Sequence, residues 1–541
     1  MHARRDGTRH VPAEWTFLSG RKYADPFNEV ELDAVFTGGG GTWRVPAFWA
    51  GSNRWRVRFA PPAPGTYRFR TECSVSSDRG LHGREGVLEA AGYEGDNPLL
   101  KHGPVEIAPD RRHFEHADGT PFFWLGDTWW MGLTKRLRWP VDVRRLAADR
   151  AAKGFTVVQI VAGLYPDMDW HDPRGANEAG FPYDKEFTRV NPAYFDKADR
   201  RIQHLVDSGL MPCIVACWGY FLPWMGVPKL KRHWRYLIAR WGAHPVAWCL
   251  AGEAKMPYYL STNEDREREQ QLEGWTEIAR YVRATDPMHR PITIHPTDRG
   301  REQVKDASLL DFEMLQTGHG GYDSIPPSMA TVIGQCASAP AMPVLIGELN
   351  YEGFLHGNYD EVQRMAFWGS VLSGAAGFTY GANGIWQANT RRRPYGPSPH
   401  GNTWGNRPWD EAMHLPGASQ LGLARRLLQR YRWWAFDPHP EWVEPAAGKE
   451  NRWLPYAAGI PREVRVIYTY HIVWRRSVRV KGIEPDVRYS ACFIDPSSGK
   501  EHALGPVKPE PDGSWLVPQQ PEMRDWLLVL TTDCSRRRPA E

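Results

Sequence analysis

The chain has 541 residues, of which 42% are hydrophobic and 24% carry a charge. These proportions are ordinary for a globular protein and exclude wholesale disorder, and the length suits one large domain with one or two smaller companions. The formal net charge of +4 is nearly balanced over this length, which argues against a nucleic-acid-binding protein with a basic binding face.

The first 98 residues predict a small antiparallel β-sandwich. Short stretches in which apolar and polar residues alternate are separated by turns rich in glycine and proline. The predicted strands cover residues 30–36, 42–49, 54–59 and 66–72. Such alternation buries one face of each strand and leaves the other in water, as two packed sheets require.

Between residues 99 and 440 the pattern changes to apolar strands that alternate with longer helices. Eight such units predict a (β/α)₈ TIM barrel, an α/β fold. The strands are mostly apolar on both faces, as a parallel sheet covered on both sides requires. They are expected at 122–126, 156–161, 211–218, 246–253, 291–295, 311–316, 344–348 and 377–381. The helices are expected at 141–153, 194–208, 229–241, 272–284, 328–337, 361–373 and 418–434.

From residue 441 to 541 the alternation of strands and helices stops. Strands at 465–470, 489–494 and 525–530 are divided by turns of Asp, Pro and Gly, which predicts a second β-sandwich. The expected organisation is therefore a TIM barrel at 99–440, flanked by an N-terminal β-sandwich at 1–98 and a C-terminal one at 441–541.

Cysteine usage and apolar segments indicate the compartment. The seven cysteines are an odd number at scattered positions, which does not form a disulfide framework. The first residues lack the apolar core of a signal peptide, and no segment has the roughly 18 apolar residues of a membrane helix. We therefore expect a cytoplasmic protein with free thiols and no membrane partner.

Two glutamates end apolar strand-like runs almost a hundred positions apart. Glu253 closes the fourth predicted strand and Glu348 closes the seventh. TIM barrels build their active sites at the carboxyl ends of their strands, where these two ends face each other across the mouth. Two facing carboxyl groups are the minimum equipment for cleaving a glycosidic bond. Glu253 is predicted to be the general acid/base and Glu348 the nucleophile, although a single strand-end glutamate is more often a helix cap or an ion-pair partner.

Three further polar residues follow predicted strands. Asp127 could bind paired sugar hydroxyls or cap the following turn. His319 could orient a carboxylate or be structural. Glu352, four residues past Glu348, could be a substrate ligand or a competing nucleophile.

The composition is skewed towards tryptophan, with 26 in the chain. An indole ring stacks on the apolar face of a sugar while its N–H remains a donor, although tryptophan is also good core material. The aromatic residues expected to wall a sugar site are Trp129, Trp130, Trp218, Tyr380 and Trp386.

Motifs for other chemistries are missing from the sequence. There is no His-Glu-x-x-His or Cys-x-x-Cys metal motif, no phosphate-binding loop and no serine nucleophile elbow. No cofactor is expected.

Several segments together resemble one family. GTPFFWLGDTWW at 119–130 is similar to the opening of the apiosidase-like glycoside hydrolases. DRAAKGFTVVQ at 149–159, GELNYE at 347–352 and GAAGFTYG at 374–381 are similar to later parts of the same barrel, in the same order.

The resemblance implies a TIM barrel that acts on plant-type glycans, with catalytic carboxylates at Glu253 and Glu348 and no cofactor. Substrate contacts are expected at Gln159, Asn350 and Tyr351 within the shared motifs. The family motif after strand four ends in Gly-Gly-Asp, whereas this chain has Glu253 there, one methylene longer. Residues 1–98 resemble the immunoglobulin-like domain that often precedes this barrel, and the tail resembles a β domain labelled collagen-binding.

The sequence therefore predicts a retaining glycoside hydrolase whose partner is an oligosaccharide or glycoside of a plant-type or bacterial glycan. A carbohydrate-binding protein that has lost catalysis on the same scaffold is the main alternative. A peptidase is disfavoured, because neither a metal motif nor a nucleophile dyad is present.

Overall fold

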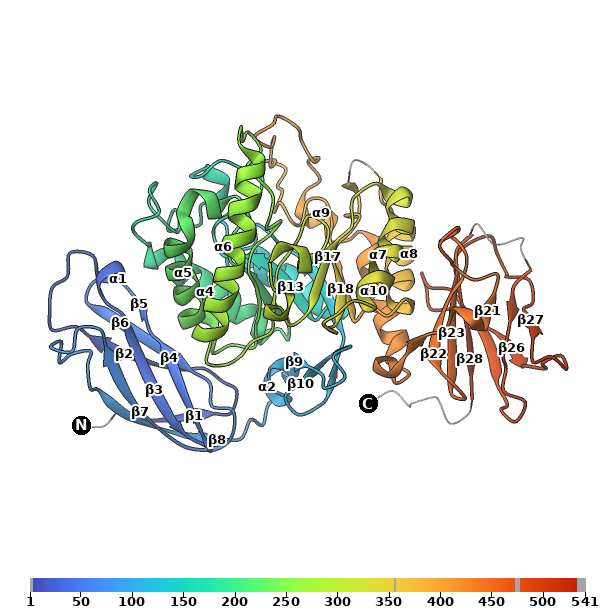
Figure 1. The fold of residues 1–541 in the computed structure, drawn as a ribbon, viewed down its shortest axis with the longest axis horizontal. Helices are drawn as coiled ribbons and strands as arrows, with labels where there is room; N and C mark the ends of the chain where they lie inside the picture. The colour runs from blue at the N-terminus through green and yellow to red at the C-terminus, as the bar shows by residue number, and fades with distance from the viewer. Residues whose placement is uncertain (1–2, 355–356, 472–476, 533–541) are drawn as a thin grey trace.

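The computed structural model describes residues 3–354, 357–471 and 477–532. A central barrel lies between two β-rich parts at opposite ends of the molecule (Figure 1). Its eight parallel strands and the flanking sheets, which are antiparallel apart from the parallel pair of Ala3–Thr8 with Glu85–Ala91, confirm the predicted fold class. Within the described residues no helix is both long and apolar enough to cross a bilayer.

The N-terminal part contains a five-stranded sheet, β1-β8-β7-β3-β4, and a three-stranded sheet, β2-β6-β5. Trp15 packs against Phe36 and Phe69 of the facing sheet, with ring centroids 5.4 and 5.1 Å away. The elements are β1 (Ala3–Thr8), β2 (Ala13–Leu18), α1 (Pro26–Glu29), β3 (Leu32–Gly38), β4 (Gly41–Pro46), β5 (Phe48–Trp49), β6 (Arg54–Phe59), β7 (Gly65–Cys73) and β8 (Glu85–Ala91).

A short connector precedes the barrel and closes its lower end. It consists of α2 (Pro98–Lys101) and a three-stranded sheet in the order β11-β10-β9. The strands are β9 (Val105–Ile107), β10 (Phe114–His116) and β11 (Pro121–Phe122). The ring of Phe114 lies 5.5 Å from Trp124 and 5.2 Å from Phe312. These strands of two or three residues are too short for a readable alternation, which explains why the sequence did not indicate them.

The barrel strands follow the order β16-β15-β14-β13-β12-β19-β18-β17, and every neighbouring pair is parallel. Their side chains are almost entirely buried, as expected for a sheet covered by helices. The strands are β12 (Trp124–Thr128), β13 (Val157–Val161), β14 (Met211–Val215), β15 (Ala247–Cys249), β16 (Ile292–Thr293), β17 (Glu313–Gln316), β18 (Val344–Glu348) and β19 (Gly377–Tyr380).

The seam between β16 and β17 lacks a strand ladder and is closed by other hydrogen bonds. The backbone N–H of Asp311 donates to Ile292 O at 2.8 Å. The Asp311 carboxylate accepts from the Ile292 N–H at 2.8 Å, and Thr293 Oγ1 donates to Phe312 O at the same distance. The barrel is thus nearly closed at this point.

The helices cover the outside of the barrel (Figure 1). α5 begins eight residues before the predicted start, because two helical pieces join across Gly226, whose φ of 74° is not helical. The first turns of α6 are polar on all sides, so periodicity could not indicate them. The helices are α3 (Val141–Lys153), α4 (Pro192–Asp207), α5 (Phe221–Trp241), α6 (Glu264–Thr285), α7 (Ile325–Cys336), α8 (Asp360–Leu372), α9 (Trp409–Ala412) and α10 (Pro416–Leu428).

Two strand ends differ from the predicted ones in ways that matter for the site. β15 ends at Cys249, so Glu253 lies on the loop beyond it. β12 runs to Thr128, so Asp127 lies inside the strand and not after it. Cys73, Cys213, Cys217, Cys249 and Cys336 are free thiols, and Cys534 lies outside the described residues.

The C-terminal part contains the sheets β20-β22-β23-β28-β25-β26 and β21-β24-β27. β20 already belongs to the larger sheet, three residues before the expected boundary at 440. The strands are β20 (Asp437–Pro438), β21 (Val443–Glu444), β22 (Tyr456–Ile460), β23 (Val464–Thr469), β24 (Arg479–Val480), β25 (Ser490–Ile494), β26 (Glu501–Pro506), β27 (Trp515–Leu516) and β28 (Trp526–Thr531).

A buried ion pair ties the C-terminal part to the barrel. Arg364 on α8 donates from Nε and Nη2 to the two carboxylate oxygens of Asp525, both at 2.9 Å. The Arg364 and Asp525 side chains are 5% and 3% exposed. Tyr468 on β23 donates to the same carboxylate at 2.8 Å. Breaking such a pair would leave a buried charge without its partner.

Replacing Arg364 with alanine is expected to lower the free energy of unfolding by about 3 to 5 kcal/mol, because Asp525 stays buried without its cation. Thermal and urea unfolding followed by circular dichroism would measure the change. Arg268→Ala is the matched control, since Arg268 on α6 also pairs with a carboxylate but is 43% exposed. A loss of about 0 to 1 kcal/mol is expected there, and equal losses in both variants would contradict the importance of the buried pair.

Candidate active site

Two carboxyl groups and one amide form the floor of a pocket at the carboxyl ends of the barrel strands. Gln316, the last residue of β17, donates from Nε2 to Glu253 Oε1 at 3.0 Å and to Glu348 Oε1 at 3.2 Å. The two glutamate oxygens therefore lie at most the sum of these lengths, about 6.2 Å, apart. The two predicted carboxyl groups thus face one another over a single space.

Two histidines hold Glu348 in its ionised form. His319 Nε2 lies 2.8 Å from Glu348 Oε1, and His295 Nε2 lies 3.3 Å from Oε2. Burial alone would raise the pKa of Glu348, but the contacts with His295 and His319 outweigh burial and lower that pKa far below its usual value. The backbone N–H of Glu253 donates to His295 Nδ1 at 3.4 Å, so Nε2 is the ring nitrogen that faces Glu348.

Glu253 has the opposite electrostatic environment. Burial raises its pKa first, and the negative charge of Glu348 raises it further. Hydrogen bonds from Gln316 and from Trp218 Nε1, which lies 3.0 Å from Glu253 Oε2, offset part of this rise. The floor therefore pairs a carboxyl group whose pKa is raised with one whose pKa is lowered.

The backbone is strained at two positions beside this floor. Glu253 has a φ of 40° and Asn350 a φ of 46°, both in the left-handed region that non-glycine residues seldom adopt. Asn350 is held there by reciprocal bonds with Gly321, to whose carbonyl its amide donates at 2.8 Å and from whose N–H it accepts at 3.0 Å. Asn350 therefore fastens the loop that follows β17 to the loop that follows β18.

Aromatic rings make up most of the pocket wall, and the pocket encloses about 140 Å³. Trp130 stands edge-on to Trp218 at 5.5 Å between centroids, and its Nε1 donates to the Tyr351 hydroxyl at 3.0 Å. Trp386 Nε1 is buried without a hydrogen-bond partner in the described residues. The lining consists of Trp130, Pro166, Asp167, Trp218, Glu253, Tyr259, Gln316, His319, Glu348, Tyr351, Phe354, Trp386 and Trp404.

A third carboxyl group, Asp167, lies in the wall on the loop after β13. Trp404 Nε1 donates to it at 3.1 Å from the long loop after β19, and Ser398 on that loop donates to its other oxygen. Trp404 also stacks on Phe354 at 5.4 Å between centroids. Burial raises the pKa of Asp167. Asp167, Trp404 and Phe354 thus link three separate loops along one side of the pocket.

The predicted site residues divide into two groups. The pocket lining includes both glutamates and also Trp130, Trp218, His319, Tyr351 and Trp386. The other predicted residues lie outside that lining: Asp127, Trp129, Gln159, Asn350, Glu352 and Tyr380.

Asp127 and Gln159 have structural partners in place of the expected sugar. Asp127 is fully buried, with Arg150 Nε 2.6 Å away and Trp129 Nε1 donating at 2.7 Å. This correction follows from the strand end, because Asp127 lies within β12 and its carboxylate meets Arg150 of α3. Gln159 donates to Gly347 O at 3.0 Å inside the barrel.

Glu352 and Tyr380 contact each other beneath the pocket wall. The Tyr380 hydroxyl and the Gly417 N–H donate to the two oxygens of Glu352, which is 1% exposed. Glu352 therefore does not face the pocket in competition with Glu348.

Sequence reasoning missed several pocket residues. Gln316 and His295 end two of the predicted strands at the same rim as the glutamates, but the strand pattern assigns no role to either. Asp167, Tyr259, Phe354 and Trp404 lie on loops of irregular length, where spacing carries no geometric signal. In the described ranges no group of His, Cys, Asp and Glu side chains has the arrangement of a metal site.

Comparisons with known proteins agree with this geometry. A family model described as apiosidase-like, catalytic domain, matches residues 108–435, and a domain of unknown function, DUF5060, matches residues 8–74. No curated protein sequence matches the chain.

Solved structures share the fold. A glycoside hydrolase is 21% identical, with 82% of this chain and 99% of that chain covered and a TM-score of 0.66. A family 5 glycoside hydrolase from Bacteroides vulgatus is 20% identical over 83% of this chain and 97% of its own, with a TM-score of 0.67. A protein from the same organism, provisionally assigned to the glycoside hydrolases, is 17% identical over 97% and 99%, with a TM-score of 0.69.

The barrel, its paired carboxyl groups and these matches define a glycoside hydrolase. Because the catalytic-domain model spans more than half of the sequence, the chain belongs to the apiosidase-like family.

The buried Glu352 gives a stability prediction. Burial raises its pKa from 4.5 to about 7, so the folded state takes up a proton more readily than the unfolded chain. The stability that the protonated form contributes is complete below pH 4.5 and is lost as the pH rises through 7. Glu352→Gln keeps the group neutral, so the variant should gain about 1 to 3 kcal/mol relative to the parent between pH 5 and pH 8.

Urea unfolding of both proteins at the two pH values would measure this gain. Glu269→Gln is the control, because Glu269 is exposed on α6 and its replacement should change stability equally at both pH values. A pH-independent difference for Glu352→Gln would contradict the assigned protonation.

Proposed function

We propose that this glycoside hydrolase removes a single terminal sugar from a plant-type or bacterial glycan with retention of anomeric configuration. Glu253 is the general acid/base and Glu348 the nucleophile. The observation that carries the proposal is the shared contact of both carboxyl groups with Gln316 Nε2.

The separation of the carboxyl groups supports retention. In retaining glycosidases the two groups lie about 5–5.5 Å apart, and in inverting ones about 6.5–9.5 Å, since a water molecule must fit between base and sugar. The limit of about 6.2 Å set by Gln316 applies to one pair of oxygens, Glu253 Oε1 and Glu348 Oε1, and is shorter than the inverting range. A carboxylate this close to its partner can reach the anomeric carbon directly.

The charge states support the division of roles. Glu348 has the lowered pKa of a group that must attack as an anion, and Glu253 has the raised pKa of a group that must donate a proton. In the first step Glu253 protonates the leaving oxygen while a Glu348 oxygen forms a bond to the anomeric carbon. In the second step Glu253, now ionised, takes a proton from water, and the hydroxide displaces Glu348 from the sugar.

The shape of the pocket supports action at a chain end. Its volume of about 140 Å³ is well below the roughly 300–1,000 Å³ of pockets that enclose larger ligands. The contacts of Trp404 with Asp167 and Phe354 connect the loops along one side, where a polymer in an open groove would have to pass. Trp386 Nε1, buried and unpaired in the described residues, offers a donor to a sugar hydroxyl.

Variants of the two glutamates should respond differently to the leaving group. Glu253→Gln is expected to lower hydrolysis of a glycoside with a poor alcohol leaving group by about 10²–10⁴-fold. Release of 2,4-dinitrophenol, which needs no proton, should be slowed far less in the first step. Glu348→Gln should abolish turnover of both glycosides, because the attacking oxygen is lost.

Proton NMR of the first-formed product from the parent enzyme would establish the stereochemistry. The retained anomer is expected, and the inverted anomer would exclude Glu348 as the nucleophile. Tight sugar binding without turnover of any glycoside by the parent protein would favour the non-catalytic carbohydrate-binding alternative.

Gln316 should set the pH range of activity. Activity requires protonated Glu253, so it should fall as the pH rises through the raised pKa of that group. The hydrogen bond from Gln316 lowers this pKa, so Gln316→Leu should move the alkaline limb of the kcat/KM profile to higher pH and reduce its maximum. Thr262→Val, on an exposed loop, serves as the control. An alkaline limb that stays in place would show that Gln316 does not tune Glu253.

A further inference from the structure

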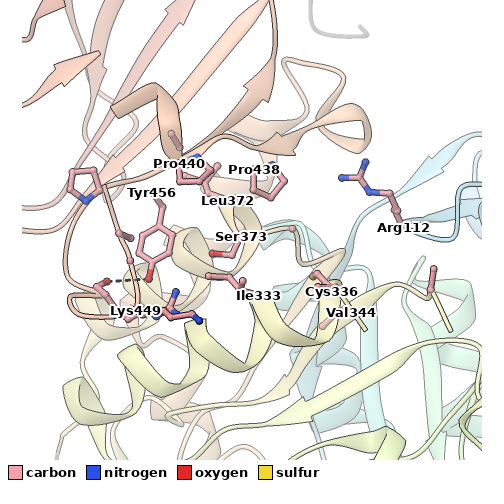
Figure 2. Close-up of a pocket in the computed structure, with 18 of the residues that line it drawn as sticks. Arg112, Ile333, Cys336, Val344, Leu372, Ser373, Pro438, Pro440, Lys449 and Tyr456 are labelled. Carbon is pink, nitrogen blue, oxygen red and sulfur yellow. Dashed lines mark hydrogen bonds between the residues drawn. The ribbon is translucent and has the colours of Figure 1, made fainter. Parts of the chain in front are cut away.

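A large cavity lies away from the catalytic pocket, between the barrel and the C-terminal sheets (Figure 2). It encloses about 580 Å³. Its walls are the ends of α7 and α8, the start of β18, the connector loop before β10 and the segment 438–457. It therefore lies at the end of the barrel opposite to Glu253 and Glu348.

The walls of this cavity are mostly apolar. Ile333, Met342, Val344 and Leu372 form the barrel side, and the Tyr456 ring faces them from β22 (Figure 2). The Tyr456 hydroxyl donates to Arg452 O at 3.1 Å, so the ring is held in place. A volume of this size is within the range of pockets that bind small organic molecules.

The charged side chains around the cavity are all basic: Arg111, Arg112, Lys449 and Arg452, with no acidic residue in the lining. Arg112 is neutralised by Asp437, whose Oδ1 lies 2.6 Å from its Nη1. In the described ranges Arg111, Lys449 and Arg452 form no ion pair with a carboxylate. Three positive charges thus surround an apolar space and have no carboxylate counterion among the residues that the structure describes.

The basic side chains around the cavity are not explained by a need to neutralise the carboxyl ends of the helices. α7 and α8 end at this cavity, and helix carboxyl ends attract cations. However, Arg111 Nε donates at 2.6 Å to Ala341 O, and Arg112 Nη2 donates at 3.3 Å to Phe436 O. Both acceptors lie outside the helices. Arg112 is neutralised by Asp437, but the contact of Arg111 with a carbonyl leaves its charge available to a ligand.

An unsatisfied hydroxyl gives a second, independent indication. Ser373, in the turn after α8, is 5% exposed, and its Oγ has no hydrogen-bond partner in the described residues. Ser373 lines the cavity beside Leu372 (Figure 2). Buried hydroxyls are normally paired, so an unpaired one in a cavity wall is placed to bind a polar group of an occupant.

We propose that this cavity binds a small amphipathic anion, with an apolar ring or chain between α7, α8 and β22 and one anionic group at the basic rim. The apolar body would cover the walls, Ser373 Oγ would bond to a polar atom, and Lys449 and Arg452 would neutralise the charge. This binding is separate from hydrolysis, since the cavity shares no residue with the catalytic pocket.

Two fluorescent probes test the proposal on the full chain. 8-Anilinonaphthalene-1-sulfonate has an aromatic body and one anionic group, and N-phenyl-1-naphthylamine has a similar body without charge. Lys449→Glu should weaken sulfonate-probe binding about tenfold and leave the neutral probe unaffected. Ala447→Trp, which fills the cavity, should remove the saturable binding of both probes.

Lys22→Glu is the control, because it makes the same charge change at an exposed position of the N-terminal part. Equal effects of Lys449→Glu and Lys22→Glu on the sulfonate probe would overturn the anion site. Unchanged binding of both probes to Ala447→Trp would show that they bind elsewhere, such as the aromatic catalytic pocket. If Ala447→Trp lacks the parent circular dichroism spectrum, Lys449→Glu decides the question alone, since Lys449 is exposed and its replacement disturbs no core.

Discussion

One amide nitrogen organises the catalytic floor. Gln316 Nε2 has two hydrogens, and it directs one to each glutamate. It therefore holds two acidic groups at a short separation that their mutual repulsion would otherwise oppose. The asymmetry comes from the neighbours, because the rings of His295 and His319 lie against the Glu348 carboxylate, whereas Glu253 Oε2 accepts from Trp218 Nε1. One donor shared by both glutamates, with different neighbours on each side, thus shifts the pKa values of two chemically equal side chains in opposite directions.

The barrel supplies these groups from four strands that follow one another in the chain. Glu253, His295, Gln316 and Glu348 come from β15, β16, β17 and β18 or from the first residues beyond them. Their positions thus depend on the strand order and on the seam between β16 and β17, which Asp311 closes with hydrogen bonds to Ile292. The connector strand containing Phe114 packs under the same barrel, so its lower end is filled by side chains.

Fold class and the paired glutamates could be read from the sequence because both depend on strong local signals. Eight apolar runs alternating with amphipathic helices leave few architectures, and the last residue of such a run marks the rim. Asp127 shows the limit of this reasoning: a strand end misplaced by two residues turned a buried partner of Arg150 into an expected sugar ligand. Trp404 and Asp167 could not be paired at all, because their contact joins loops whose paths no periodic pattern describes.

The contacts among Asp167, Trp404 and Phe354 separate substrate selection from reaction chemistry. None of these three side chains forms a hydrogen bond with Gln316, Glu253 or Glu348 in the described residues. All three lie on loops. Substitutions in the long segment between β19 and α9 can therefore open or narrow the enclosure while the bond-breaking groups keep their geometry. Related enzymes could diversify in the glycans they trim by exchanging this one stretch of chain, with little risk to the barrel that supports it.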